Sequence, residues 1–393
     1  MLSFPGKKRA MEMENNQVSS QDILELILSK LPLKPRTRFK CVSRVWNALI
    51  TDLRHIQPPT TASGLVFSFK KPSSINPIYQ LNLLEVVQDQ SLSCFVHTSL
   101  THELPWLIDS CNGLLLFGTK KGISLTYLVS SPVRNQWLKL PPPGHGSSVP
   151  VSASLAFDGV RQHFDVICQF WEDADIKNGT LKYQIFSSQS WQWREYNGKI
   201  HNSALCLSKD FNREEWYCPS LYCKGRMYWI WSLCLLVFNE NKLSFELMEL
   251  PKTKLRLTSL YCGKRLWESE DHLHYCDSTY VGFYIWERIE IDNRNDFGLK
   301  WRLKNYIRMD ELVSRNYYPD DVVFLISPVS VKPCAFNDDL QILYFQLPRI
   351  IAAYSFETRK AVKILSDDAI GQSSHDNVFP FLFNAVDLHG WGR

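Results

Sequence analysis

The feature that most constrains the fold is a two-stranded pattern that recurs along the chain. An apolar or aromatic residue stands ten positions before an aromatic one in three segments: Tyr127 to Trp137, Tyr183 to Trp193 and Leu235 to Phe245. Each segment combines a strand-like half, a polar turn and a second strand that opens on the aromatic residue, which predicts a β-hairpin. Trp286 to Trp301 is a longer copy with a longer loop at Asp292 to Asn295, and Tyr354 to Lys360 indicates another hairpin turn.

The spacing of these hairpins predicts a repeat architecture. Successive gaps between the second-strand aromatics are 56, 52 and 56 residues, counted along Trp137, Trp193, Phe245 and Trp301. A period of about fifty residues is typical of kelch-like propeller blades, and roughly 330 residues at this period make about six blades. Wedge-shaped blades that pack face to face need bulky side chains between them, which accounts for the aromatic residues. The alternative architecture is a pair of β-sandwiches.

The N-terminal region has a helical pattern instead. Residues 1–18 are polar and charged, and we expect them to be disordered. Within residues 19–56, apolar residues recur at helical spacing in two groups: Ile23, Leu24, Ile27, Leu28 and Leu31, then Phe39, Val42, Val45, Trp46, Leu49 and Ile50. Residues 57–64 begin with a cluster of breaker residues and predict a linker, so residues 65–393 form the β domain. We therefore expect a mainly β protein with a small N-terminal unit of three helices.

Turn and cap residues divide this helical region. Pro32 ends the first helix, and Pro35 suits the first turn of the second, where its missing N–H costs nothing. Ser43 is well placed to cap a third helix. Three short helices bury little surface and are marginally stable alone. A partner, or the rest of the chain, must therefore cover the remaining apolar face.

The helical region closely resembles the F-box. The matching run extends from Asp22 to Pro32, continues with Leu33-Lys34, and resumes from Arg38 to Trp46. In F-box proteins these helices bind the Skp adaptor of a cullin–RING ubiquitin ligase and leave the following domain free to hold a substrate. The resemblance implies that adaptor docking and the local core involve the following residues: Ile23, Leu24, Ile27, Leu28, Leu31, Pro32, Leu33, Lys34, Arg38, Phe39, Val42 and Trp46. Lys34 and Arg38 would contribute polar contacts at the rim.

The β region carries a second resemblance. Its segments resemble the F-box-associated domain of plant F-box proteins at Cys111 to Leu115, Gln136 to Pro141, Leu155 to Asp158, Gly225 to Trp229 and Gly263 to Trp267. Together the two resemblances imply a substrate-recognition subunit of a Skp–cullin–F-box ubiquitin ligase, whose propeller holds a protein target of unknown identity. Such a subunit acts by proximity and performs no covalent chemistry, so we expect neither enzyme activity nor a cofactor.

The residue pattern leaves three alternatives open. Residues 30–44 carry basic side chains without an acid, which would suit a helix-turn-helix protein that binds nucleic acid, although nothing marks a recognition helix. A propeller enzyme would require acids or metal ligands at the central mouth. A binding protein that has lost ligase assembly is a milder variant, because Ser19-Ser20 stand where F-box proteins usually have Leu-Pro.

Composition limits the partners and the compartment. The net charge of +4 is mild for 393 residues and argues against a nucleic-acid or membrane-surface protein. The eleven cysteines are scattered without a repeated spacing, which favours a reducing, intracellular compartment, cytoplasmic or nuclear or both. The N-terminus lacks the apolar core of a signal peptide, and the longest apolar run, Tyr228 to Phe238, is too short to span a membrane.

The best metal candidates are three residues that alternate along one predicted strand, His272, His274 and Cys276, with Cys262 before them. Side chains two positions apart on a strand point in parallel rather than to a common tetrahedral centre, and no Cys-x-x-Cys pair supports them. The sequence therefore predicts ordinary strand packing and no metal site. No phosphate-binding loop or catalytic motif is recognisable either.

Overall fold

The computed structural model of the chain divides it into two compact units, Met1–Pro58 and Pro59–Arg393. This division falls inside the predicted linker at 57–64. The structure describes residues 24, 27–28, 39–49, 64–71, 78–85, 93–99, 106–121, 124–144, 152–158, 163–170, 180–201, 220–231, 234–251, 263–269, 272–293, 296–313, 331–337, 340–366, 378–382, 386–388 and 391.

The described part of the first unit is helical. Leu24, Ile27 and Leu28 have helical backbone, η1 (Phe39–Cys41) is a short 3-10 turn, and residues 44–49 form a further helix. The backbone N–H of Trp46 donates to Ser43 Oγ at 3.1 Å, the hydrogen bond of a helix N-cap. The predicted capping role of Ser43 is thus confirmed.

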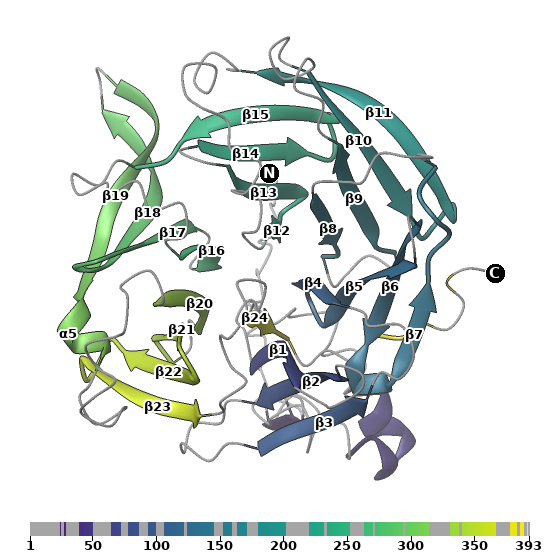
Figure 1. Cartoon of the computed structure of the whole chain (residues 1–393), viewed down its shortest axis with the longest axis horizontal. Helices are drawn as coiled ribbons and strands as arrows, with labels where there is room; N and C mark the ends of the chain where they lie inside the picture. Colours follow the sequence, from purple (N-terminus) through teal and green to yellow (C-terminus); the bar gives the residue numbers. More distant parts are fainter. Residues whose placement is uncertain are drawn as a thin grey trace, which may run out of the picture. The chain divides into compact units, whose positions relative to one another are not determined.

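The described part of the second unit is a ring of six four-stranded blades (Figure 1). Blade 1 consists of β24 (Val378–Phe381), β1 (Gly64–Lys71), β2 (Ile78–Glu85) and β3 (Ser93–Ser99). Blade 2 consists of β4 (Trp106–Cys111), β5 (Leu114–Lys121), β6 (Ser124–Ser131) and β7 (Gln136–Lys139). Blade 3 consists of β8 (Ser152–Ala156), β9 (Asp165–Phe170), β10 (Thr180–Ser187) and β11 (Gln192–His201). Blade 4 consists of β12 (Leu221–Cys223), β13 (Arg226–Trp231), β14 (Cys234–Asn239) and β15 (Ser244–Glu249). Blade 5 consists of β16 (Lys264–Ser269), β17 (His272–Thr279), β18 (Gly282–Asn293) and β19 (Asp296–Arg308). Blade 6 consists of β20 (Lys332–Asn337), β21 (Ile342–Leu347), β22 (Ile350–Ser355) and β23 (Lys360–Ser366). Two short helical segments, η2 (Pro132–Arg134) and α5 (Met309–Leu312), lie between strands.

Two features join the blades into a closed ring. The C-terminal strand β24 pairs antiparallel with β1, where Val66 lies opposite Phe379, and so completes the first blade. Blades 3 and 4 share a short parallel ladder in which Ile200 of β11 lies opposite Phe245 of β15. The predicted propeller of about six blades is confirmed, and the β-sandwich alternative is wrong.

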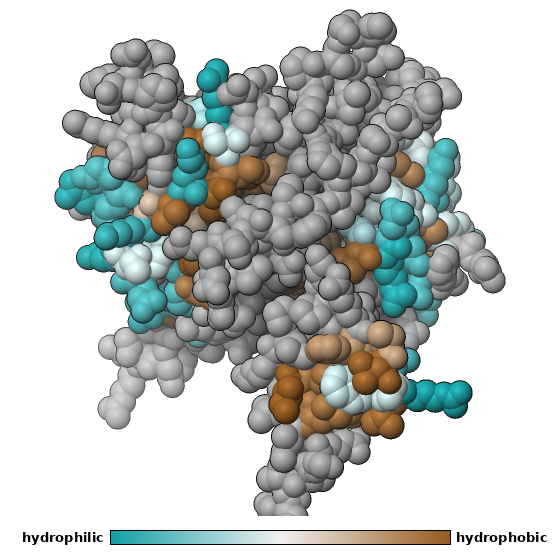
Figure 2. Space-filling view, turned by 90° about the horizontal axis from the view of Figure 1, so that it is seen from below, coloured by the Kyte–Doolittle hydropathy of each residue, from teal (hydrophilic) through white to brown (hydrophobic). Residues whose placement is uncertain are grey.

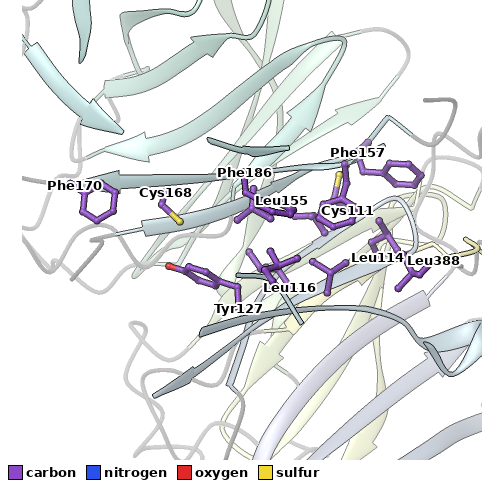
Figure 3. Packing of buried hydrophobic residues seen from close by; sticks show 14 residues of the cluster. Cys111, Leu114, Leu116, Tyr127, Leu155, Phe157, Cys168, Phe170, Phe186 and Leu388 are labelled. Atoms are coloured by element: carbon purple, nitrogen blue, oxygen red, sulfur yellow. Dashed lines mark hydrogen bonds between the residues drawn. The ribbon is translucent and has the colours of Figure 1, made fainter. Parts of the chain in front are cut away.

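The hydrophobic core lies between consecutive blades. Blades 2 and 3, for example, enclose Leu116 and Tyr127 on one side and Leu155 and Phe186 on the other (Figure 3). Five further clusters fill the remaining interfaces between neighbours, including the closing one between blade 6 and blade 1. Each sheet is therefore buried on both faces. The middle strands of a blade, such as β13 and β14, consequently consist of nearly continuous apolar residues.

The predicted hairpins are the outer two strands of the blades. The second-strand aromatics face their partners in four ladders: Trp137 opposite Ser130, Trp193 opposite Phe186, Phe245 opposite Phe238 and Trp301 opposite Arg288. The predicted longer loop at 292–295 is wrong. In blade 5 the strands themselves lengthen, so that Asp292 pairs with Phe297 and Asn293 with Asp296.

In blades 3, 4 and 5 the repeat aromatic also contacts the previous blade. Trp193 Nε1 donates to the backbone oxygen of Pro141 at 2.8 Å, and Trp301 Nε1 donates to that of Glu249 at 3.0 Å. Both bonds span 52 residues, so they are equivalent positions of the repeat. In blade 4 the corresponding Phe245 packs against Tyr183 with the ring centroids 4.9 Å apart. The aromatics therefore fill the space between wedge-shaped blades, as the sequence predicted.

Candidate functional site

The helical unit has a small core. Leu28 and Leu49 are buried, and Leu24 and Trp46 pack against them half-buried. Phe39 contacts Trp46 edge to face, with ring centroids 5.6 Å apart. Among the twelve residues predicted for adaptor docking or the local core, Leu24, Leu28 and Trp46 therefore belong to the core.

The remaining large apolar residues described in this unit are exposed. They are Ile27 with 54% of its surface exposed, Phe39 with 36%, Val42 with 56% and Val45 with 59%. Figure 2 shows the described residues of the unit, at the lower right, as a largely brown surface. Exposed apolar side chains that form a contiguous patch are typical of protein-interaction surfaces. We call Ile27, Phe39, Val42 and Val45 the exposed apolar set.

The structure thus separates buried from exposed members of this set, which the sequence pattern could not do. Val45 is not among the residues predicted from the resemblance. Its position in the 3.6-residue periodicity, which places it on a helix face, could have identified it. Six predicted residues lie outside the described part of the chain: Ile23, Leu31, Pro32, Leu33, Lys34 and Arg38. Most of the basic run 30–44 lies outside it as well, and Arg44 within it is exposed.

The inner strands of the propeller share a buried carboxylate that the sequence did not reveal. Asp109 of β4 is 3% exposed, and its Oδ2 accepts hydrogen bonds from Ser220 Oγ at 2.6 Å and from the backbone N–H of Leu155 at 3.0 Å. Its Oδ1 accepts the N–H of Ser110 at 2.9 Å. One side chain of blade 2 is thereby tied to the first strand of blade 3 and to the residue before the first strand of blade 4.

The charge of Asp109 is disfavoured by its position. Burial raises its pKa to about 6, although the hydrogen bonds of Ser220, Leu155 and Ser110 and the nearby charge of Arg265 lower it. Arg265 of β16 is itself buried and lies over the ring of Phe379 in β24 at 5.7 Å. With both oxygens accepting hydrogen bonds, Asp109 is suited to hold the inner strands together rather than to transfer protons.

Blade 5 contains a second buried polar group, which lies on the strand of the predicted metal candidates. His274 stacks on Trp267 with ring centroids 5.6 Å apart, and its Nε2 lies 3.5 Å from Glu287 Oε1. Arg302 and Lys304 reach the same carboxylate at 2.6 and 3.3 Å. Cys276 lies fully buried in the apolar cluster between blades 5 and 6.

These contacts assign the histidine and the cysteine to packing. Burial and the charge of Lys304 lower the pKa of His274 and outweigh Glu287, which raises it, so the fold favours the neutral imidazole. Burial raises the pKa of Glu287, but Arg302 and Lys304 outweigh it, so the pKa is lowered overall. Among the described residues, no group of three or more His, Cys, Asp or Glu side chains could hold a metal ion; Cys262 lies outside them.

Comparison with known families decides the identity of both units. The family model described as "F-box protein At3g26010-like, beta-propeller" matches residues 86–367, and the F-box domain model matches residues 20–57. The chain belongs to the At3g26010-like F-box β-propeller family. The helical unit is therefore an F-box, and the β unit is the propeller of an F-box protein.

Relatives of this F-box protein are known from Arabidopsis thaliana. It is 24% identical to the F-box protein At3g10240 over 78% of this chain and 82% of that protein, and 24% identical to At1g47390 over 92% and 94%. The F-box protein At5g07610 is 23% identical over 92% of this chain and 89% of its own length. An F-box joined to a propeller, with such relatives, supports a role in substrate recognition by Skp–cullin–F-box ligases in general, and F-box proteins are generally non-catalytic adaptors.

Solved structures add little to this assignment. The chain resembles an extracellular domain of a one-component system from B. thetaiotaomicron at 12% identity and a TM-score of 0.33, covering 78% of this chain and 34% of that one. It also resembles a protein from Lactobacillus plantarum at 10% identity and a TM-score of 0.37, over 80% of this chain and 98% of that one. Both TM-scores are too low to support a conclusion. Within the described residues, no helix is long and apolar enough to cross a membrane.

Proposed function

We propose that this F-box binds a Skp-type adaptor through the exposed apolar set, while the propeller holds a protein target for ubiquitination. The observation that carries the proposal is the exposure of Ile27, Phe39, Val42 and Val45 beside a core of only a few residues. A helical unit this small gains stability when a partner covers such a face. The predicted residues Ile23, Leu31, Pro32 and Leu33 would extend the same interface, with Lys34 and Arg38 at its rim.

The proposed mechanism is proximity. The F-box ties the chain to the cullin–RING scaffold in the cytoplasm, the nucleus or both, and the propeller holds the target there. Lysines of the target then experience a high effective concentration of the charged ubiquitin carrier. In this mechanism the chain binds and orients its partners, and the covalent step belongs to the rest of the ligase.

A pair of valine substitutions tests the adaptor interface. The full chain is co-expressed with a Skp adaptor, and the affinity of the wild type is compared with that of the double variant Val42→Asp, Val45→Asp. Both side chains are exposed, so the substitutions leave the Leu28–Leu49 core in place. The matched control is Val133→Asp, Val362→Asp, which introduces the same two charges at exposed valines of the propeller.

The expected result is selective loss of binding. Buried apolar anchors at interfaces contribute about 1–3 kcal/mol each, so two of them predict a loss of roughly a hundredfold or more in adaptor affinity. The control variant should bind like the wild type, and circular dichroism should show both variants folded. A wild-type chain that fails to bind the adaptor, or a loss shared equally by the control, would refute the proposal.

A further inference from the structure

The outer strand of blade 5 has the longest open edge in the described propeller. β19 has 13 residues, whereas the other outer strands have between 4 and 10. It is the last strand of its sheet, and within the described residues no strand pairs with its outer side. Figure 1 shows β18 and β19 at the outside of the ring. A long strand edge presents backbone N–H and C=O groups on which another chain can pair.

The two faces of this strand differ in chemistry. Lys300 lies opposite Ile289 and Arg302 opposite Glu287, so both project from the face directed at blade 6. Leu303 lies opposite Trp286 and Tyr306 opposite Tyr284, on the face directed at blade 4. One face of the edge is therefore basic, and the other is apolar and aromatic up to Arg308, which lies opposite Gly282 at the end of the strand.

A β-bulge strengthens the basic face. Arg302 pairs with Glu287, Leu303 with Trp286 and Asn305 with Ile285, so Lys304 is the extra residue of β19. The bulge directs Lys304 to Glu287 beside Arg302, and the one carboxylate fixes two cations. Residues 300–308 contain no acid, and Arg308 at the end of the strand pairs with Asp310. Arg302 and Lys304 together carry one positive charge more than the single carboxylate of Glu287 balances, so this face has an excess of positive charge.

The apolar face offers fixed anchors. Leu303 is 43% exposed and Tyr306 is 39% exposed. The rings of Tyr284 and Tyr306 lie 4.7 Å apart, and Tyr306 Oη donates to the backbone oxygen of Val281 at 3.0 Å. Rigid, partly exposed tyrosines are suited to contact a protein partner because little side-chain entropy is lost on binding.

We propose that the β19 edge binds an extended segment of the protein target in which acidic and apolar side chains alternate. Such a segment would add to blade 5 as a further strand, with its acids over Lys300 and Arg302 and its apolar residues over Leu303 and Tyr306. The inference rests on the proposed function for the identity of the partner as a ligase target. A second copy of this chain is a poorer partner, because antiparallel pairing of β19 with itself would oppose basic side chains to basic ones.

The probe for this proposal is a labelled peptide of about eight residues, a typical strand length, in which glutamate and valine alternate. A control peptide has the same composition with the glutamates and valines in two blocks, so it cannot place its acids on one face of a strand. Fluorescence anisotropy measures the binding of each peptide to the full chain. The test variant is Lys300→Glu, Leu303→Asp, which alters one exposed residue on each face of β19 and leaves Arg302 and Lys304 on Glu287.

The control variant is Lys360→Glu, Val362→Asp. It makes the same change in charge at exposed residues of β23, the outer strand of blade 6. Lys360 and Val362 lie opposite Ser355 and Ala353, on the face directed at blade 1. They are therefore separate from the proposed binding face.

The expected result is that the wild type binds the alternating peptide at least about tenfold more tightly than the block peptide, and that the β19 variant loses about tenfold or more in affinity. The β23 variant should stay within about twofold of the wild type. No binding to the wild type, equal binding of both peptides, or an equal loss in the β23 variant would overturn the proposal. So would a single-stranded oligonucleotide of equal charge that displaces the peptide as effectively as unlabelled peptide does. Adaptor capture by the β19 variant should be unchanged, which separates failure here from failure of the proposed ligase function.

Discussion

The buried carboxylate of Asp109 makes a quantitative prediction for the pH dependence of stability. Its pKa rises from an ordinary value of 3.8 to about 6 in the fold, chiefly through burial. Between these pH values the folded chain holds a proton that the unfolded chain has released, so stability falls as pH rises from about 4 to about 6. At 1.36 kcal/mol per pKa unit, the loss attributable to this group is about 3 kcal/mol.

The substitution Asp109→Asn removes this titration and retains the size of the side chain. The free energy of unfolding is measured by urea titration at pH steps between about 4 and 7 for both proteins. The wild-type value minus the variant value should fall by about 2–3 kcal/mol across this range and level off near pH 7. Asp310→Asn, the same change at an exposed site, should not reproduce the slope. Parallel profiles for the wild type and Asp109→Asn would refute the assignment of a raised pKa to a desolvated carboxylate.

Four further substitutions test the packing of the propeller. Trp193→Phe and Trp301→Phe each remove one hydrogen bond between blades and should lower the free energy of unfolding by about 1 kcal/mol, measured by urea titration. An unchanged free energy of unfolding in both variants would show that these bonds do not join the blades. Gly282→Ala should abolish stable folding or lower the free energy of unfolding by more than about 3 kcal/mol, measured by thermal unfolding. The reason is that the φ of Gly282 is +147° and a Cβ there would lie 1.9 Å from the backbone oxygen of Ile307. A near-native melting temperature would contradict this. Since burial and Lys304 lower the pKa of His274, the wild type should lose stability relative to His274→Gln as pH falls below about 6.5, because the unfolded chain then binds the proton more readily. A constant difference between about pH 5 and 7 would show that the pKa of His274 is not lowered in the fold.

The sequence predicted the parts of the fold that depend on local repetition. The ten-residue interval from Tyr183 to Trp193 defines a hairpin because the turn and the aromatic at the start of the second strand are neighbours in the chain. The closing strand is different. Val378–Phe381 pairs with β1, more than 300 residues away, and no local pattern in these four residues indicates such a partner.

The candidate sites were predictable to a smaller degree. Periodicity placed Leu28 and Val42 on helix faces, but it could not say that one is buried and the other exposed, because both belong to apolar stripes. The role of Asp109 depends on Leu155 and Ser220, which the fold brings from other blades. The bulge that directs Lys304 to Glu287 depends on the register of two long strands, and side-chain periodicity alone does not predict that register.

Hydrogen–deuterium exchange on the full chain with and without a Skp adaptor tests the central claim most directly. The account predicts that adaptor binding slows exchange within residues 20–57, the matched F-box, and most strongly around the exposed apolar set. The strands of the propeller should exchange at the same rates in both states. An adaptor that leaves exchange in residues 20–57 unchanged, or protects only the blades, would contradict the assignment of the helical unit as the adaptor-binding surface.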